Sequence, residues 1–84
     1  MKRLDDILEN IDVISVKGVT DRDISVIEFD SRKVTKGALF IAVKGYVSDG
    51  HNFIPDAIRS GAVAVICEKI PADAREDICW IKTG

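Results

Sequence analysis

With 84 residues, 46% of them hydrophobic, the chain can bury one small core and cannot hold a second independent domain. Its 12 lysines and arginines and 14 acidic residues give a formal net charge of −2. Because the two signs are interspersed, the chain has no basic stripe that could bind a nucleic acid or an anionic membrane. The apolar runs fall far short of the roughly 20 residues that cross a bilayer, and the polar start MKRLDDILEN does not resemble a secretory signal, which predicts a cytoplasmic protein.

The first third of the chain predicts one short helix and two extended segments. Apolar residues recur at helical spacing between Leu4 and Ile11, with charged residues on the opposite face. Residues 12–18 and 24–31 are rich in β-branched side chains and are separated by the polar stretch 19–23. We therefore expect two strands joined by a loop.

The remainder predicts strands that alternate with a helix. The runs 38–43 and 62–67 show no polar alternation, which favours parallel strands covered on both faces. Between them, helical spacing begins at Phe53, with Asn52 placed to cap the helix, Pro55 in its first turn and Gly61 at its end. Residues 71–77 predict a short helical turn or loop, and 78–83 a last strand. The expected fold is a small layered α/β domain with a mixed, mostly parallel sheet of about four to five strands and two to three helices.

With two cysteines and one histidine, the chain has few of the residues that usually bind a zinc ion. Cys67 and Cys79 each lie within an apolar, strand-like segment. Free cysteine usually behaves as a small hydrophobe, so we expect buried thiols rather than a redox pair or half of a zinc site.

The loop after residues 38–43 has the glycine spacing of a phosphate-binding loop, with Gly45 and Gly50 separated by four residues. His51 and Asn52 occupy the positions where such a loop carries its lysine and its hydroxyl, so it cannot hydrolyse a nucleotide in the usual way. It is either an anion-binding loop that uses main-chain N–H groups, or a plain strand-to-helix turn in which glycines supply positive φ angles.

A second polar group, Asp30-Ser31-Arg32, follows a predicted strand, at the rim where α/β sheets bind ligands. The alternative is an ion pair between Asp30 and Arg32, with Ser31 capping the next turn. A hydrolase triad of Ser31, His51 and Asp49 is a third possibility, but no G-x-S-x-G turn surrounds the serine.

Residues 30–68 resemble the first domain of the Mur ligases, ATP-dependent enzymes that add amino acids to the UDP-N-acetylmuramoyl precursor of peptidoglycan. The resemblance rests on elements in a fixed order, which are Asp-Ser-Arg, Gly37, Leu39-Phe40, Ala42, Gly45, Asp49-Gly50-His51, Phe53, Ala57 and Gly61-Ala62. The stretch from Gly45 to Glu68 is most similar to the member that adds the third residue of the stem peptide, a tripeptide synthetase. The member that adds the D-Ala-D-Ala dipeptide is the close alternative.

The resemblance implies roles for eleven residues. Phe29 would line the uracil pocket, Ser31 would hydrogen-bond the UDP-sugar, and Tyr46, Val47 and Ser48 would contact the uridine or the diphosphate. The other six would shape the loop or touch the ligand less directly, namely Asp30, Arg32, Gly45, Asp49, Gly50 and His51.

The resemblance also implies that residues 1–84 form one UDP-sugar-binding domain of a three-domain ligase, with no catalytic residue, metal or cofactor of its own. ATP and Mg²⁺ would belong to the central domain, and that domain and the C-terminal one would be its partners. In the intact ligase ATP would phosphorylate the substrate carboxyl group, and the incoming amine would attack the acyl phosphate. A second hypothesis, from a different class of function, is a non-catalytic interaction module with the same fold.

Overall fold

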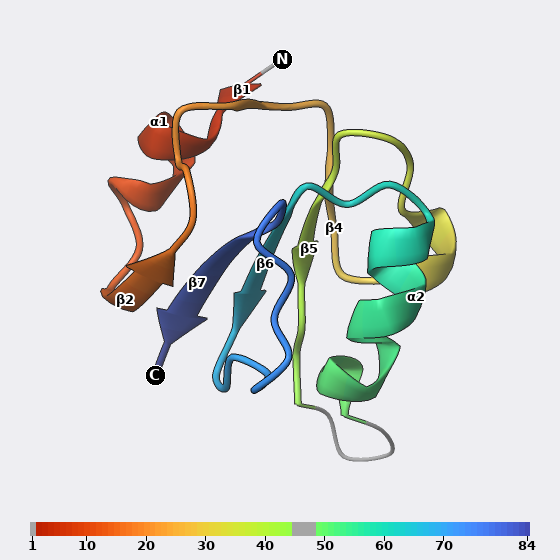
Figure 1. The fold of residues 1–84 in the computed structure, drawn as a ribbon. Coiled ribbons are helices and arrows are strands. Elements are labelled where there is room, and N and C mark those ends of the chain that lie inside the picture. Colours follow the sequence, from red (N-terminus) through yellow and green to blue (C-terminus); the bar gives the residue numbers. More distant parts are fainter. Residues whose placement is uncertain (1, 45–48) are drawn as a thin grey trace.

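The computed structural model describes residues 2–44 and 49–84, and within them five strands form one sheet in the order β2-β7-β6-β5-β4 (Figure 1). Strands β4 to β7 run parallel to their neighbours, whereas β2 pairs antiparallel with β7. The predicted mixed, mostly parallel sheet is therefore confirmed. The strands are β2 (Val13–Lys17), β4 (Ile27–Glu28), β5 (Leu39–Ile41), β6 (Ala64–Cys67) and β7 (Cys79–Thr83).

Two α-helices pack on the sheet, and two short 3-10 helices follow strand ends. Helix α1 (Leu4–Leu8) is shorter than the sequence predicts, while α2 (Ile54–Arg59) lies between β5 and β6 in the chain, as expected for a crossover between parallel strands. The 3-10 helices are η1 (Ser31–Lys33) after β4 and η2 (Gly50–Phe53) immediately before α2. Figure 1 shows α2 to the right of β4 and β5, and α1 at the other end of the sheet near β2.

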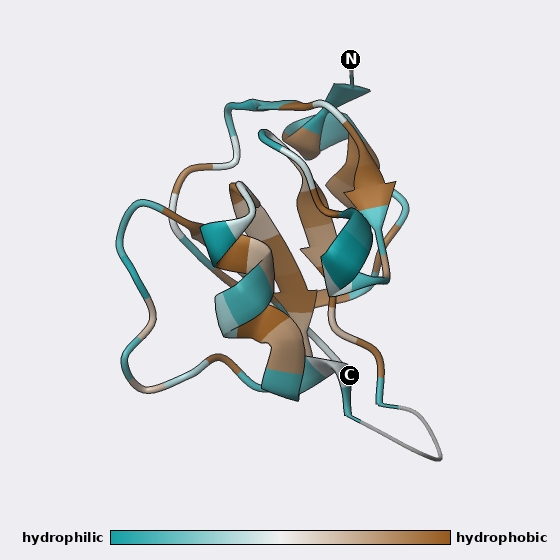
Figure 2. Cartoon of the chain, turned by 90° about the vertical axis from the view of Figure 1, so that its right-hand side faces the viewer, coloured by the Kyte–Doolittle hydropathy of each residue, from teal (hydrophilic) through white to brown (hydrophobic). Residues whose placement is uncertain are grey.

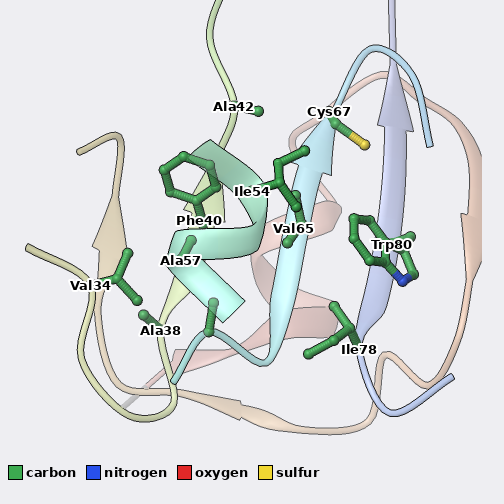
Figure 3. Packing of buried hydrophobic residues seen from close by; sticks show 11 residues of the cluster. Val34, Ala38, Phe40, Ala42, Ile54, Ala57, Val65, Cys67, Ile78 and Trp80 are labelled. Atoms are coloured by element: carbon green, nitrogen blue, oxygen red, sulfur yellow. The ribbon is translucent and has the colours of Figure 1, made fainter. Parts of the chain in front are cut away.

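The inner strands bury side chains on both faces, which explains their unbroken apolar sequences. Along β6, Val65 and Cys67 join a cluster that contains Ile54 and Ala57 of α2, and Ala64 and Ile66 join a second cluster with α1. Figure 3 shows the first cluster, with Phe40 beside α2 and Val65 near Ile54, while Trp80 lies further along the sheet on β7. Each helix therefore covers its own face of the sheet.

The predicted extended segment 24–31 is not one strand, which corrects the sequence reading. Its first part, β3 (Asp23–Ile24), pairs with β1 (Lys2–Arg3) in a separate two-stranded sheet, and only β4 joins the main sheet. Ser25 lies between them and bonds to the turn before β5, with its N–H on Gly37 O at 3.0 Å and its hydroxyl on Lys36 O at 2.8 Å. These bonds redirect the chain from one sheet to the other.

The two cysteines are buried and free, as predicted, and they lie on opposite faces of the sheet. In the β6–β7 register Cys67 is opposite Lys82, and Cys79 is opposite Ala64. They therefore cannot form a redox pair. Burial raises the pKa of both thiols, which keeps them in the unreactive protonated form.

The surface of the described residues is mostly polar. Figure 2 shows hydrophobic colour concentrated on the strands and on the inner side of α2, with hydrophilic segments in the outer loops. Residues 71–77 form turns rather than a helix, and Trp80 Nε1 donates to Arg75 O in this loop at 2.9 Å. In residues 2–44 and 49–84, neither helix approaches the length and apolarity of a bilayer span.

Gly61 follows the C-cap of helix α2 and terminates the helix, as the sequence predicts. Gly61 has φ +114°, and a Cβ at this position would lie 2.6 Å from Lys36 Cα. Its carbonyl oxygen accepts a hydrogen bond from Gly37 N–H at 2.9 Å, which ties the end of the helix to the turn before β5. Both the backbone conformation and the close approach require glycine.

We therefore expect Gly61→Ala to lower the free energy of unfolding by about 2 kcal/mol or more, because the new methyl group adds strain and a clash with main-chain atoms. Urea unfolding followed by circular dichroism measures this change. Ser60→Ala, at the exposed neighbouring position, is the control and should shift stability by no more than about 0.5 kcal/mol. Equal effects of the two substitutions would show that Gly61 is not constrained in this way.

Candidate functional site

A groove of about 560 Å³ lies at the carboxyl edge of the parallel sheet. Its walls are formed by the segment after β4, by Val43, which follows β5, and by residues of η2 and α2. Polar residues of an α/β sheet gather at this edge, and the sequence predicted this position for Asp30, Ser31 and Arg32. The lining residues are Phe29, Asp30, Ser31, Arg32, Val43, Gly50, Phe53 and Asp56.

Asp30 caps η1 and binds Arg32 at the same time. Its Oδ1 accepts the Arg32 main-chain N–H at 2.9 Å, and its two oxygens accept Arg32 Nε at 3.1 Å and Nη2 at 2.9 Å. The side-chain hydrogen bonds from Arg32, followed by the main-chain one, lower the pKa of Asp30 to about 2. The expected ion pair is therefore present, but the residue that caps the turn is Asp30 and not Ser31.

Asp49 repeats this arrangement one strand further along the sheet. Its Oδ1 accepts the His51 main-chain N–H at 3.0 Å and lies 2.6 Å from His51 Nδ1. The main-chain hydrogen bond, followed by the side-chain one, lowers the pKa of Asp49. The two capping aspartates also share their backbone conformation, with φ −104° and ψ 116° at Asp30, and φ −100° and ψ 120° at Asp49.

His51 connects η2 to the end of β6. Its Nε2 accepts the Glu68 main-chain N–H at 3.0 Å, so the ring proton lies on Nδ1 and is donated to Asp49. Both ring nitrogens are thus engaged in holding the backbone, and Nε2 is not available to take a proton from Ser31. The triad considered from the sequence is therefore wrong, and His51 has a structural role.

Gly50 is required by packing rather than by its backbone angle. Positive φ values occur at Gly18, Gly37 and Gly61 among the described glycines, and Gly50 is not one of them. A Cβ on Gly50 would lie 2.6 Å from Val43 N and 2.8 Å from Val43 O. Its N–H donates to Val43 O at 2.8 Å, so η2 rests directly on the chain that leaves β5. Of the two readings of this loop, the one in which glycine supplies a positive φ therefore does not hold at Gly50.

The sequence also misplaced the N-cap of the helix. Asn52 lies inside η2, and Asp49 supplies the capping oxygen three residues earlier. A 3-10 turn precedes α2 and shifts the start of the helical region toward the N-terminus, while Pro55 still occupies the first turn of α2 as predicted.

Four residues of the predicted site, Gly45, Tyr46, Val47 and Ser48, lie outside the described residues. The chain on either side of them is held by an isolated antiparallel bridge between Lys44 and Asp49. The remaining predicted residues, except Asp49 and His51, line the groove together. Those two line a neighbouring pocket and support η2.

The structure adds three groove residues that the sequence reading did not assign to a site, namely Val43, Phe53 and Asp56. Val43 and Phe53 are 49% and 40% exposed although they are large and apolar. Their helical or strand-like spacing predicted burial in the core. The sequence did contain one indication that these two residues belong to the site, because Val43 and Phe53 stand on either side of the glycine-containing segment 45–50.

The described residues do not fit ATP or Mg²⁺. His51 and Asn52 replace the lysine and the hydroxyl of a phosphate loop, and His51 is committed to Asp49 and Glu68. In residues 2–44 and 49–84, no three His, Cys, Asp or Glu side chains gather closely enough to hold a metal ion.

Comparison with known proteins decides the family. The family model described as "Mur ligase family, catalytic domain" matches residues 23–79. The chain belongs to the Mur ligase family. The resemblance found in residues 30–68 is thereby confirmed.

The similar curated proteins include ligases that add 2,6-diaminopimelate. The UDP-N-acetylmuramoyl-L-alanyl-D-glutamate--2,6-diaminopimelate ligases of Cytophaga hutchinsonii and Clostridioides difficile are 54% identical over 69 residues and 55% identical over 67 residues, respectively. These matches cover 82% and 80% of this chain and 14% of each relative. The chain therefore spans about one seventh of the length of these Mur ligases.

Solved Mur ligase structures share the fold. A crystal structure of MurF from Acinetobacter baumannii superposes with a TM-score of 0.65 at 33% identity, covering 75% of this chain and 13% of that one. MurF from Thermotoga maritima, solved in complex with ADP, gives a TM-score of 0.55 at 40% identity over 60% of this chain and 12% of that one. The α/β fold predicted from the sequence is thus found in other members of the family.

The pairing of Asp30 with Arg32 predicts an unusually acidic carboxyl group. Titration of the side-chain carboxyl carbons by NMR should place the pKa of Asp30 near 2, and Arg32→Gln should return it toward 3.8, its usual value. Because the pKa is lowered in the folded state, the pair stabilises the fold above about pH 4, and this contribution disappears as the pH falls toward 2. An unchanged midpoint in Arg32→Gln would show that Arg32 does not cause the shift.

The two polar residues near the start of η2 should differ in their effect on stability. Asp49→Ala removes the acceptor for two His51 groups, and we expect it to lower the free energy of unfolding by more than Asn52→Ala does. Asn52→Ala, which removes no cap, should change it by no more than about 0.5 kcal/mol. Thermal and urea unfolding measure both, and a larger loss for Asn52→Ala would restore that residue as the cap.

Proposed function

We propose that this chain is the UDP-sugar-binding domain of a cytoplasmic Mur ligase that adds the third residue of the peptidoglycan stem peptide. The observation that carries the proposal is the groove at the carboxyl edge of the sheet, where Phe29 and Ser31 lie together with exposed apolar side chains. The substrate would be the UDP-N-acetylmuramoyl dipeptide. Relatives with 54–55% identity are named for the addition of 2,6-diaminopimelate, and we extend that amino acid to this ligase.

The groove has the form that such a ligand needs. It is open at the sheet edge, so a nucleotide can enter at one end while the sugar and peptide extend away from the domain. Contacts to the remote UDP end supply binding energy that holds the distant carboxyl group in place for the reaction. In this proposal ATP and Mg²⁺ act in a central domain of a longer protein, and the chain alone is not catalytic.

The addition of D-Ala-D-Ala is the second candidate, because the MurF structures share this fold. Sequence identity favours the first candidate, with 39–58% to diaminopimelate ligases and 33–40% to the MurF proteins. Both candidate substrates carry a UDP group, so UDP binding by this chain does not separate the two functions. An activity assay on a longer protein that includes the other domains separates them. Only the tripeptide-forming ligase would consume ATP in the presence of the UDP-linked dipeptide and diaminopimelate.

Calorimetric titration with the UDP-N-acetylmuramoyl dipeptide tests the binding role. We expect the chain to bind it, Ser31→Ala to weaken binding by about 1 kcal/mol, roughly fivefold, and replacement of residues 46–48 by glycines to weaken it further. Ser60→Ala removes the same hydroxyl group outside the groove and should leave binding unchanged. A folded chain that shows no response to any UDP-sugar would exclude the proposed function.

A further inference from the structure

Two phenyl rings line the groove from separate elements. Phe29 follows β4 and is 65% exposed, and Phe53 ends η2 and is 40% exposed. Large apolar side chains this exposed leave unburied area that a ligand can cover. Val43, also exposed, adds a third apolar group to the same groove. The apolar area is thus concentrated at one place on this edge of the sheet.

The charges of the groove select against an anion beside these rings. The charged groups among its described lining residues are Asp30, Asp56 and Arg32. Arg32 is held by both oxygens of Asp30, so its positive charge is already compensated. Asp56 forms an ion pair with Arg59, which does not line the groove. The two carboxylates and the guanidinium are thus all paired, so the described lining residues offer no free positive charge to a diphosphate, which favours a flat, uncharged group beside the rings.

The position of Phe53 is fixed before any ligand binds. Asp49 caps η2, Gly50 rests on the main chain of Val43, and His51 joins η2 to the end of β6. Three independent contacts therefore hold the short helix that carries the ring. A side chain held in this way loses little conformational freedom when it binds, which increases affinity.

We propose that Phe53 is a ligand-binding residue, and that Phe29 and Phe53 form the two aromatic walls of a slot for the uracil ring. The diphosphate then points away from Asp30 and Asp56, which line the groove. This inference rests on the proposed function and assigns to Phe53 a contact that the sequence reading did not give it. Stacking on aromatic rings is the usual way in which proteins hold a single base.

The test compares UDP binding by the wild-type chain, Phe53→Leu and Phe53→Tyr. Leucine keeps the apolar bulk and removes the ring, so we expect its Kd for UDP to rise by at least about fivefold, the low end for loss of one base–aromatic stack. Tyrosine keeps the ring and should bind nearly as wild type does. Circular dichroism checks that each variant is folded. Val19→Ala is the control, since Val19 is 58% exposed and does not line the groove.

A second measurement separates stacking from general apolar contact. In the complex, ring currents should move the NMR signals of uracil H5 and H6 upfield, and Phe53→Leu should reduce that movement while Phe53→Tyr retains it. Unchanged affinity and unchanged shifts in Phe53→Leu, with UDP still bound, would overturn the role of Phe53 and leave the proposed function standing. Failure of the wild-type chain to bind UDP would overturn both.

Discussion

The burial of β5, β6 and β7 on both faces determines where this domain can carry chemistry. Consecutive side chains of β5, of β6 and of the first three residues of β7 enter opposite core clusters, so none of those positions can hold a group that needs water or a ligand. Polar residues are therefore confined to the strand ends. At the carboxyl edge, the segments that follow β4 and β5 diverge and leave the groove between them.

The groove depends on two aspartate caps built in the same way. In each, an aspartate in extended conformation accepts the main-chain N–H two residues later and also binds the side chain of that residue, which is Arg32 or His51. Each cap starts a 3-10 helix directly after a strand or its loop. Motifs that resemble catalytic or ligand-binding groups in the sequence thus act first as local scaffolds, and their neighbours face the ligand.

The sequence predicted the sheet well because periodicity is a local property of strands that are buried on both faces. It identified the strands on either side of α2, the end of that helix at Gly61 and the buried cysteines. It failed where distant parts of the chain decide the outcome. Ser25 bonds to the turn at Lys36 and Gly37, and this divides a continuous β-branched segment between two sheets.

The site was predicted less completely, for a geometric reason. Asp30, Ser31 and Arg32 were correctly placed at the sheet edge, since strand ends can be read from the sequence. Phe53 was assigned to the core because it stands four residues before the buried Ala57. The 3-10 turn before α2 has fewer residues per turn than an α-helix, so it breaks this spacing and leaves the ring at the groove.

The groove joins parts of the chain that lie far apart in sequence, from Phe29 to Asp56, in a domain with one small core. A molecule bound there contacts all of these segments at once and is released when any of them unfolds. Occupancy and folding are therefore thermodynamically linked, and a ligand at one hundred times its Kd adds about 2.7 kcal/mol to the stability of the domain. For a chain of this size, that increment is a large share of the total, so the melting temperature reports directly on the ligand.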